Sequence, residues 1–231
     1  MEGDARTWTV ISLGGSCIVP GEIDIDFLQR FKMLIEERVR AGMRFMIITG
    51  GGRTAREYQE ALGKLGNTSK DGLDWVGVGA VRLNALLVAK MFGDLAHSEV
   101  VNIDPKDFSG TEKAIVVGGA WGVGTSTDYG SVNFAKRVGA TRLVNLSNID
   151  KVYTADPRTN PDAQPIDTIT WAEFRKLIPS EWTPGLSSPF DPIAAKMAEA
   201  IGLEVAIMNG KNLDNLAEYL DGREFTGTVI S

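Results

Sequence analysis

The sequence is poor in two residue types that often carry chemistry. It contains one cysteine, Cys17, and one histidine, His97, among its 231 residues. A single cysteine excludes an intramolecular disulfide framework and fits a reducing compartment. A single histidine excludes a metal site built from several histidines and argues against a Ser-His-Asp catalytic triad. We assign no role to either residue.

The chain also lacks the features that direct proteins to membranes or nucleic acids. No apolar run approaches the ~18 residues of a membrane span, and the chain does not start with a basic segment followed by an apolar one. The formal net charge is −6, so we do not expect a basic surface that binds nucleic acid. These absences predict a cytoplasmic protein with neither a membrane nor a nucleic acid as partner.

The chain is instead a regular alternation of predicted strands and helices. Apolar runs, most of them followed by glycine or small polar residues, predict strands at 8–13, 45–49, 99–103, 114–117, 143–146, 204–208 and 228–230. Helical spacing and capping signals predict helices that include 27–39 and 53–58, then 74–93, 128–138, 171–178, 192–201 and 213–220, with an exposed linker at 63–72. This order predicts an α/β fold with a mainly parallel sheet between helices, as one large domain or two small ones.

Glycine clusters follow three of these strands, at 14–15, 50–52 and 118–119. Glycine lets backbone amides approach an anion closely, and a following helix adds positive partial charge. Each cluster alone is weak support for phosphate binding, because strand-to-helix turns use glycine for geometry. All three would lie at the same edge of a parallel sheet, and their agreement favours a phosphate site.

The stretch 143–157 (LVNLSNIDKVYTADP) is the strongest local signal in the chain. A buried strand opens there into a polar loop, and such carboxyl ends are where open α/β sheets bind ligands. Ser147 and Asn148 offer hydrogen bonds, and Tyr153 offers an aromatic face for a base, so we interpret the stretch as a nucleotide-binding loop. The common nucleotide motifs are missing: Thr125 stands at the lysine position of a possible Walker A sequence, and no GxGxxG follows the first strand.

Five segments together carry a more specific resemblance. They are GGS at 14–16, GGGRTAREY at 50–58, TSTD at 125–128, NIDKVYTADPRTNPDA at 148–163 and SSPFDPIAAKMAE at 187–199. From about residue 9 to the end, the chain resembles the amino-acid-kinase superfamily, and within it the archaeal-type uridylate (UMP) kinases. The resemblance implies a single three-layer αβα domain over 1–231, with acceptor binding at about 1–130 and ATP binding at about 131–231. It implies transfer of the γ-phosphoryl of ATP to UMP, giving UDP and ADP in pyrimidine nucleotide synthesis, and a homohexamer.

The same resemblance assigns roles to individual residues. It implies catalytic roles for Lys196, Asp128 and Arg56. It implies ATP contacts for Gly14, Gly15, Ser16, Gly52, Arg56, Ser147, Asn148, Tyr153 and Asp156. It implies UMP contacts for Gly51, Asp74, Ala120, Trp121, Gly122, Val123, Gly124, Thr125, Ser126 and Thr127. It implies no metal site made by side chains, with Mg²⁺ arriving on the ATP.

Taken alone, several of these residues have simpler interpretations. Lys196 and Arg56 fit ordinary charges on a helix surface, and Asp74 and Asp128 fit helix caps. The chain also departs from the bacterial enzymes, which carry a lysine where Ser12 stands here. Two alternatives therefore stay open: a kinase of the same superfamily with another small acceptor, and a non-catalytic protein that binds a nucleotide or oxyanion.

Overall fold

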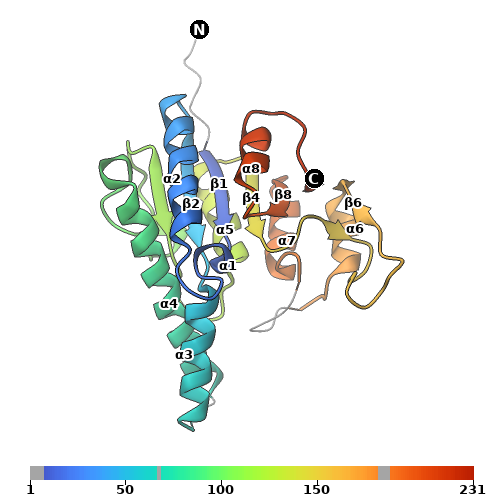
Figure 1. The fold of residues 1–231 in the computed structure, drawn as a ribbon, viewed down its shortest axis with the longest axis horizontal. Coiled ribbons are helices and arrows are strands. Elements are labelled where there is room, and N and C mark those ends of the chain that lie inside the picture. The colour runs from blue at the N-terminus through green and yellow to red at the C-terminus, as the bar shows by residue number, and fades with distance from the viewer. Residues whose placement is uncertain (1–7, 67–68, 182–187) are drawn as a thin grey trace.

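The computed structural model describes residues 8–66, 69–181 and 188–231, so residues 67–68 of the predicted linker and residue 187 of the SSPFDPIAAKMAE segment lie outside it. A seven-stranded sheet forms the centre of the molecule (Figure 1). Its strands, in spatial order, are β3 (Ile115–Gly118), β2 (Arg44–Thr49), β1 (Trp8–Leu13), β4 (Arg142–Ser147), β8 (Glu204–Asn209), β9 (Thr228–Ile230) and β7 (Thr168–Ile169). The first five are parallel, whereas β9 runs antiparallel to β8.

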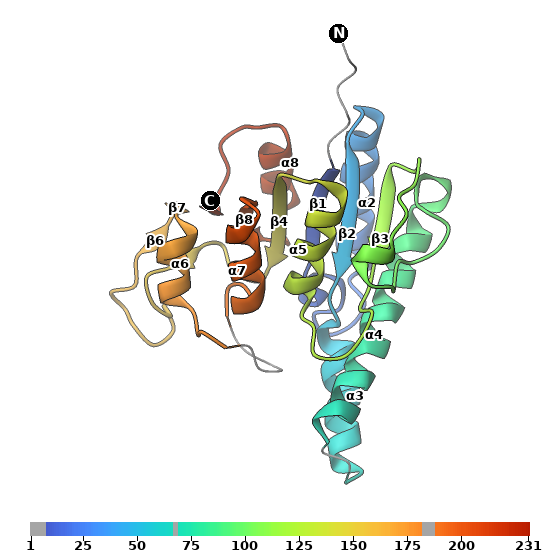
Figure 2. The same ribbon diagram turned by 180° about the vertical axis from the view of Figure 1, so that it is seen from behind.

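Helices cover both faces of this sheet, which confirms the predicted three-layer αβα arrangement. One face carries α2 (Ile25–Arg40), α4 (Lys70–Met91) and α8 (Leu213–Leu220), and the other carries α5 (Thr127–Val138), α6 (Trp171–Leu177) and α7 (Pro192–Ala200) (Figures 1 and 2). Because successive strand residues point to opposite faces, Ile11 and Leu13 of β1 join the first core and Val10 joins the second. Strands buried on both faces explain the continuous apolar runs in the sequence.

Two further helices and a hairpin follow the carboxyl ends of strands. The short α1 (Gly15–Ile18) follows β1, and α3 (Gly52–Lys64) follows β2 and packs along the first half of α4, with Gln59 Nε2 donating to Leu73 O at 3.0 Å. A two-stranded hairpin, β5 (Val152–Tyr153) with β6 (Pro165–Ile166), follows β4. Two short 3₁₀ turns, η1 (Gly93–Leu95) and η2 (Pro105–Asp107), lie before β3.

Three local predictions are wrong. The segment 99–103 forms no strand but one isolated bridge, Val101 to Gly118, because the chain turns where Glu99 N donates to His97 Nδ1. Helix α4 begins at Lys70 and is capped by Ser69, so Asp74 lies inside it and the linker is shorter than predicted. Helix α5 is capped by Ser126 and not by Asp128, which leaves the Asp128 carboxylate for other contacts.

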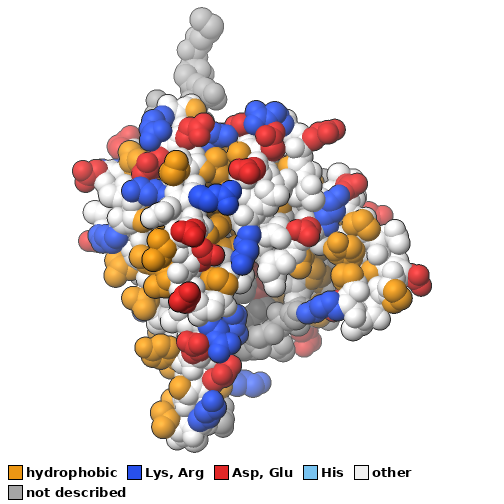
Figure 3. Space-filling view, in the orientation of Figure 1, with side chains coloured by type: hydrophobic (Ala, Val, Ile, Leu, Met, Phe, Trp, Pro, Cys, Tyr) orange, Lys and Arg blue, Asp and Glu red, His pale blue; other side chains and the backbone are white. Residues whose placement is uncertain are grey.

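Helix α4 has the length and mean hydropathy (1.3) of a membrane span, but its contacts are those of a core helix. Val88 and Ala85 are fully buried in the first core, and Asn84 Nδ2 donates to the carbonyls of Gly50 (2.9 Å) and Gly51 (3.1 Å). Its other side is apolar and open: Trp75, Leu83, Leu86 and Leu87 are 37–60% exposed. Hydrophobic side chains gather on this side of the molecule (Figure 3).

The glycine loops after β1 and β2 touch backbone to backbone. A Cβ on Gly15 would lie 2.0 Å from Gly52 N, and a Cβ on Gly52 would lie 2.2 Å from Gly15 O. Gly52 also has φ +62°, a conformation that other residues rarely adopt. Gly50 N donates to Leu13 O (2.9 Å) and Arg53 N donates to Val19 O (2.9 Å), which locks the two loops together. No side chain fits between them.

We predict that Gly15→Ala lowers the free energy of unfolding by about 3 kcal/mol, because the added methyl group overlaps backbone atoms that have nowhere to move. Gly63→Ala is the control: Gly63 lies in α3 with no atom within 4 Å of an added Cβ, so stability should stay constant or rise by up to about 1 kcal/mol. Urea denaturation of both variants measures this. Equal stability of the two variants would contradict the tight packing of the loops.

Candidate active site

Five parallel strands end at one edge of the sheet and bring most of the predicted site residues together there. The loops after β1, β2, β3, β4 and β8 are neighbours because the strands pair in register, with Leu13 beside both Thr49 and Leu146, and Ser147 beside Asn209. The glycine loops thus lie between the 120–127 loop on one side and the loop after β4 on the other.

Asp128, in the first turn of α5, is the polar centre of this edge. Its Oδ1 accepts from Ser12 Oγ of β1 at 3.2 Å and from Asn145 Nδ2 of β4 at 2.8 Å. Its Oδ2 accepts from the backbone N–H of Asp191 at 3.1 Å, immediately before α7. The Asp191 carboxylate in turn caps α7 by accepting from Ile193 N (2.6 Å) and Ala194 N (2.9 Å). One carboxylate therefore ties two central strands to two helices.

The environment of Asp128 alters its ionisation. Burial raises the pKa of the Asp128 carboxyl to about 7, and the nearby negative charge of Asp191 acts in the same direction. The three hydrogen bonds, from Asp191 N, Ser12 and Asn145, favour the ionised form and oppose this rise in pKa. Asn145 is 5% exposed and Ser12 is 2% exposed, so both support Asp128 from inside the sheet. Sequence reasoning did not identify Asn145, because it is one polar residue within an apolar strand.

The 120–127 loop is held against α4 by two side chains. Asp74 Oδ2 accepts from Gly124 N at 2.7 Å, and Arg82 Nε donates to Ala120 O at 2.9 Å. Trp121 anchors the loop from the other side, with its ring 6.1 Å from that of Tyr129 and 6.2 Å from that of Phe134. A cavity of about 30 Å³ remains beneath the loop, lined by Thr49, Val81, Gly119, Ala120, Trp121, Thr125, Ser126 and Thr127 among others. The sequence analysis did not predict a role for Arg82, because nothing in the local sequence distinguishes it from an ordinary arginine on a helix surface.

The loop after β4 presents polar groups next to the first glycine loop. Gly14 N donates to Leu146 O at 2.9 Å, which places Gly14 and Ser16 beside the end of β4. Ser147 is half-buried and Asn148 is exposed, while Tyr153 lies in the β5–β6 hairpin. Asp156 is exposed and accepts from the Arg158 guanidinium at 2.8 Å, which lowers the pKa of Asp156. Arg158 is a second cation that sequence reasoning missed.

The two predicted catalytic cations are not fixed in place. Lys196 lies in the second turn of α7 and Arg56 in the first half of α3, and both are exposed. Neither makes a hydrogen bond or ion pair with any residue that the structure describes. By contrast, Arg53 pairs with Glu57 at 2.9 Å. Lys196 and Arg56 are thus exposed cations on the helices that follow Asp191 and Gly51.

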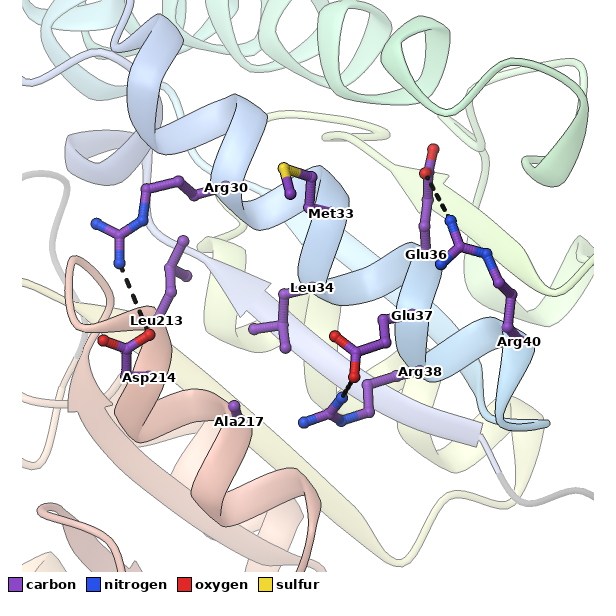
Figure 4. Close-up of a pocket in the computed structure, with 10 residues that line it drawn as sticks. All are labelled: Arg30, Met33, Leu34, Glu36, Glu37, Arg38, Arg40, Leu213, Asp214 and Ala217. Carbon is purple, nitrogen blue, oxygen red and sulfur yellow. Dashed lines mark ion pairs between the residues drawn. The ribbon is translucent and has the colours of Figure 1, made fainter.

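A separate groove of about 510 Å³ runs between α2 and α8 (Figure 4). Its charges are paired with one another, as in Arg30–Asp214 (3.8 Å), Arg40–Glu36 (3.5 Å) and Arg38–Glu37 (2.9 Å). It contains none of the predicted site residues. Self-paired surface charges offer little to a charged ligand, so the carboxyl edge of the sheet is the better candidate.

Comparisons with known proteins identify the family of this chain. A model described as the amino acid kinase family matches residues 7–209. Uridylate kinase of Pyrococcus abyssi is 33% identical over 228 residues, which cover 96% of this chain and 98% of that protein. Uridylate kinase of Methanospirillum hungatei is 32% identical over 225 residues, covering 96% of this chain and 94% of that protein. The crystal structure of uridylate kinase from Archaeoglobus fulgidus is similar with a TM-score of 0.81 at 28% identity, covering 96% of this chain and 99% of that one.

We predict a pH-dependent stability contribution from Asp128. Its pKa rises from about 3.9 in an unfolded chain to about 7 here, so the folded state holds an extra proton between these values. The free energy of unfolding of the wild type, relative to Asp128→Asn, should therefore be highest near pH 4 and fall as the pH rises through about 7. Urea denaturation across this range measures the difference. A difference that stays constant with pH would contradict the buried environment of this carboxyl.

Proposed function

Because the chain belongs to the amino acid kinase family, we propose that it transfers the γ-phosphoryl group of ATP to UMP, giving UDP and ADP. The observation that carries the proposal is the direct contact between the glycine loops after β1 and β2. One loop adjoins the polar loop after β4, and the other adjoins the 120–127 loop, so the backbone of the two glycine loops forms the boundary between two polar sites. Backbone amides at such a boundary suit two phosphates that must meet.

The acceptor side belongs to the part at about 1–130. We assign UMP to Gly51, Asp74 and the loop from Ala120 to Thr127. Asp74 now accepts from Gly124 N, and a ribose hydroxyl would replace or join that donor. Loop 120–127 and Asp74 would then close on the nucleoside together, since Arg82 keeps the start of the loop against α4.

The donor side belongs to the part at about 131–231, completed by the first glycine loop. Gly14, Gly15, Ser16 and Gly52 would lie against the ATP phosphates, with Arg56 as an exposed cation beside them; the Gly14 amide itself is bonded to Leu146 O. Ser147, Asn148, Tyr153 and Asp156 would hold the adenosine end. Asp156 arrives paired with Arg158, whose guanidinium is a further donor for this end of the nucleotide.

The transfer itself needs positioning and charge neutralisation more than covalent help. The attacking UMP phosphate oxygen is already ionised, so no general base is required. Lys196 would neutralise charge on the moving phosphoryl group, and Asp128 would hold the start of the helix that carries Lys196. As the resemblance implies, Mg²⁺ would be held mainly by the ATP phosphates and not by a cluster of side chains. When bound, Mg²⁺ would neutralise phosphate charge.

We also propose that the enzyme is a homo-oligomer of the cytoplasm, active in pyrimidine nucleotide synthesis. The open apolar side of α4 supports self-association, because four large side chains there lack cover in a single chain. A hexamer is the form that the family resemblance implies. Sedimentation velocity on the purified protein measures the assembly directly.

The acceptor is tested by ADP production from Mg-ATP with UMP, CMP, acetylglutamate, carbamate and isopentenyl phosphate in turn. We expect saturable turnover with UMP and little with the others. Turnover with a different acceptor would support kinase activity but reject UMP as the acceptor. ATP binding without any turnover would favour the non-catalytic alternative.

We predict that Lys196→Ala lowers kcat about 100-fold and changes the affinity for ATP far less, because its charge acts mainly on the transition state. Lys176→Ala, which removes an exposed lysine of α6, is the matched control and should leave kcat unchanged. Steady-state kinetics and equilibrium ATP binding separate the two effects. Equal losses in kcat and in affinity would assign Lys196 to ground-state binding instead.

A further inference from the structure

The loop after β8 is the one loop at the carboxyl edge to which neither the motifs nor the proposed function assign a role. It runs from Asn209 through Gly210 and Lys211 to Asn212, the N-cap of α8. Gly210 N donates to Ser147 O at 2.8 Å, which joins this loop to the end of β4. On its other side, a Cβ on Gly210 would lie 2.5 Å from Cys17 Sγ. Gly210 therefore lies between Ser147 and the residue that follows Ser16.

Lys211 is held at this junction by its backbone. Lys211 N donates to Asn209 Oδ1 at 3.0 Å, and Asn209 Nδ2 donates to Asp150 Oδ1 at 2.9 Å in the loop after β4. The Lys211 side chain is exposed and forms no ion pair within residues 8–66, 69–181 and 188–231. A fixed backbone with an unpaired ammonium group suits an anion that arrives from solvent.

The charge of Lys211 reaches the first glycine loop. Burial raises the pKa of the Cys17 thiol to about 11, and the Lys211 ammonium is the strongest influence in the opposite direction. Cys17 belongs to α1 and directly follows Ser16, so the same positive charge acts beside the Gly14–Ser16 loop. Among the nearby carboxylates, Asp24 acts on Cys17 in the opposite sense and more weakly than Lys211, and Asp150 is engaged by Asn209 Nδ2.

We propose that Lys211 binds the β- or γ-phosphate of ATP, between the Gly14–Ser16 loop and Ser147. This assignment rests on the proposed function for the identity of the nucleotide. It gives the donor phosphates a cation on a rigid loop, in addition to Lys196 and Arg56 on helix surfaces. Lysine acts on phosphate as a point charge, so Arg at this position should keep most of the effect and a neutral side chain should lose it.

The test compares nucleotide binding by Lys211→Gln, Lys211→Arg and the wild type in calorimetric titrations with Mg-ATP and with AMP, without UMP. We expect Lys211→Gln to weaken ATP binding about tenfold, to leave AMP binding nearly unchanged, and to be largely rescued by Lys211→Arg. Lys136→Gln, at an exposed position near the end of α5, is the matched control and should bind both nucleotides like the wild type.

Each other result overturns the assignment. If Lys211→Gln binds ATP with the affinity of the wild type, Lys211 does not contact the ATP phosphates. Equal weakening of ATP and AMP, or failure of Lys211→Arg to rescue, would indicate a structural effect on the loop. Wild-type protein that binds ATP but does not phosphorylate UMP would overturn the proposed function alone, whereas wild-type protein that binds no ATP would overturn both.

Discussion

The contact between Gly15 and Gly52 is the constraint on which the rest of the site depends. It sets two strand-end loops at van der Waals distance through backbone atoms alone, so side chains cannot adjust the spacing. Two neighbouring contacts extend this rigidity. Asn84 holds the second loop to α4, and Gly14 N holds the first loop to β4. A phosphoryl group passes between substrates only when donor and acceptor are held within a few tenths of an ångström of the reactive geometry, and rigid loops at a sheet edge supply that.

Two carboxylates near these loops, Asp74 and Asp156, have partners within the protein. Asp74 is paired with a backbone amide of the 120–127 loop, and Asp156 with a neighbouring guanidinium. Asp74 is half-buried, so its hydrogen bond offsets the cost of that burial, whereas Asp156 is exposed and gains little stability from its ion pair. Asp128 differs, because all of its partners are interior groups of the fold. It holds the start of α7 against the sheet, and Arg56 of α3 and Lys196 of α7 are the exposed cations that we propose to meet phosphate.

The sequence predicted the sheet well because its strands are buried on both faces and therefore read as continuous apolar runs. The predicted strands at 8–13 and 228–230 agree with β1 and β9, and the Asp191-Pro192 helix start agrees with α7. The first residue of a helix was harder to predict where several possible capping residues are adjacent in the sequence. In the TSTD segment, Ser126 caps α5, and the Asp128 carboxyl accepts hydrogen bonds from Ser12, Asn145 and Asp191 instead. Ser12 and Asp128 are 116 positions apart in the sequence, so no local pattern shows their contact. Likewise, Asn145 and Arg82 have functional positions only because of distant partners, and no local pattern marks them.

The central claim is that one edge of the sheet holds a donor and an acceptor nucleotide at the same time, with their phosphates meeting at the glycine loops. The most direct test is calorimetric binding of a single molecule in which adenosine and uridine are joined by a chain of five phosphates. The account predicts one molecule bound per chain, far more tightly than ATP or UMP alone, and competition with both nucleotides. Binding no tighter than ATP, or competition with only one of the two nucleotides, would contradict a shared site at this edge.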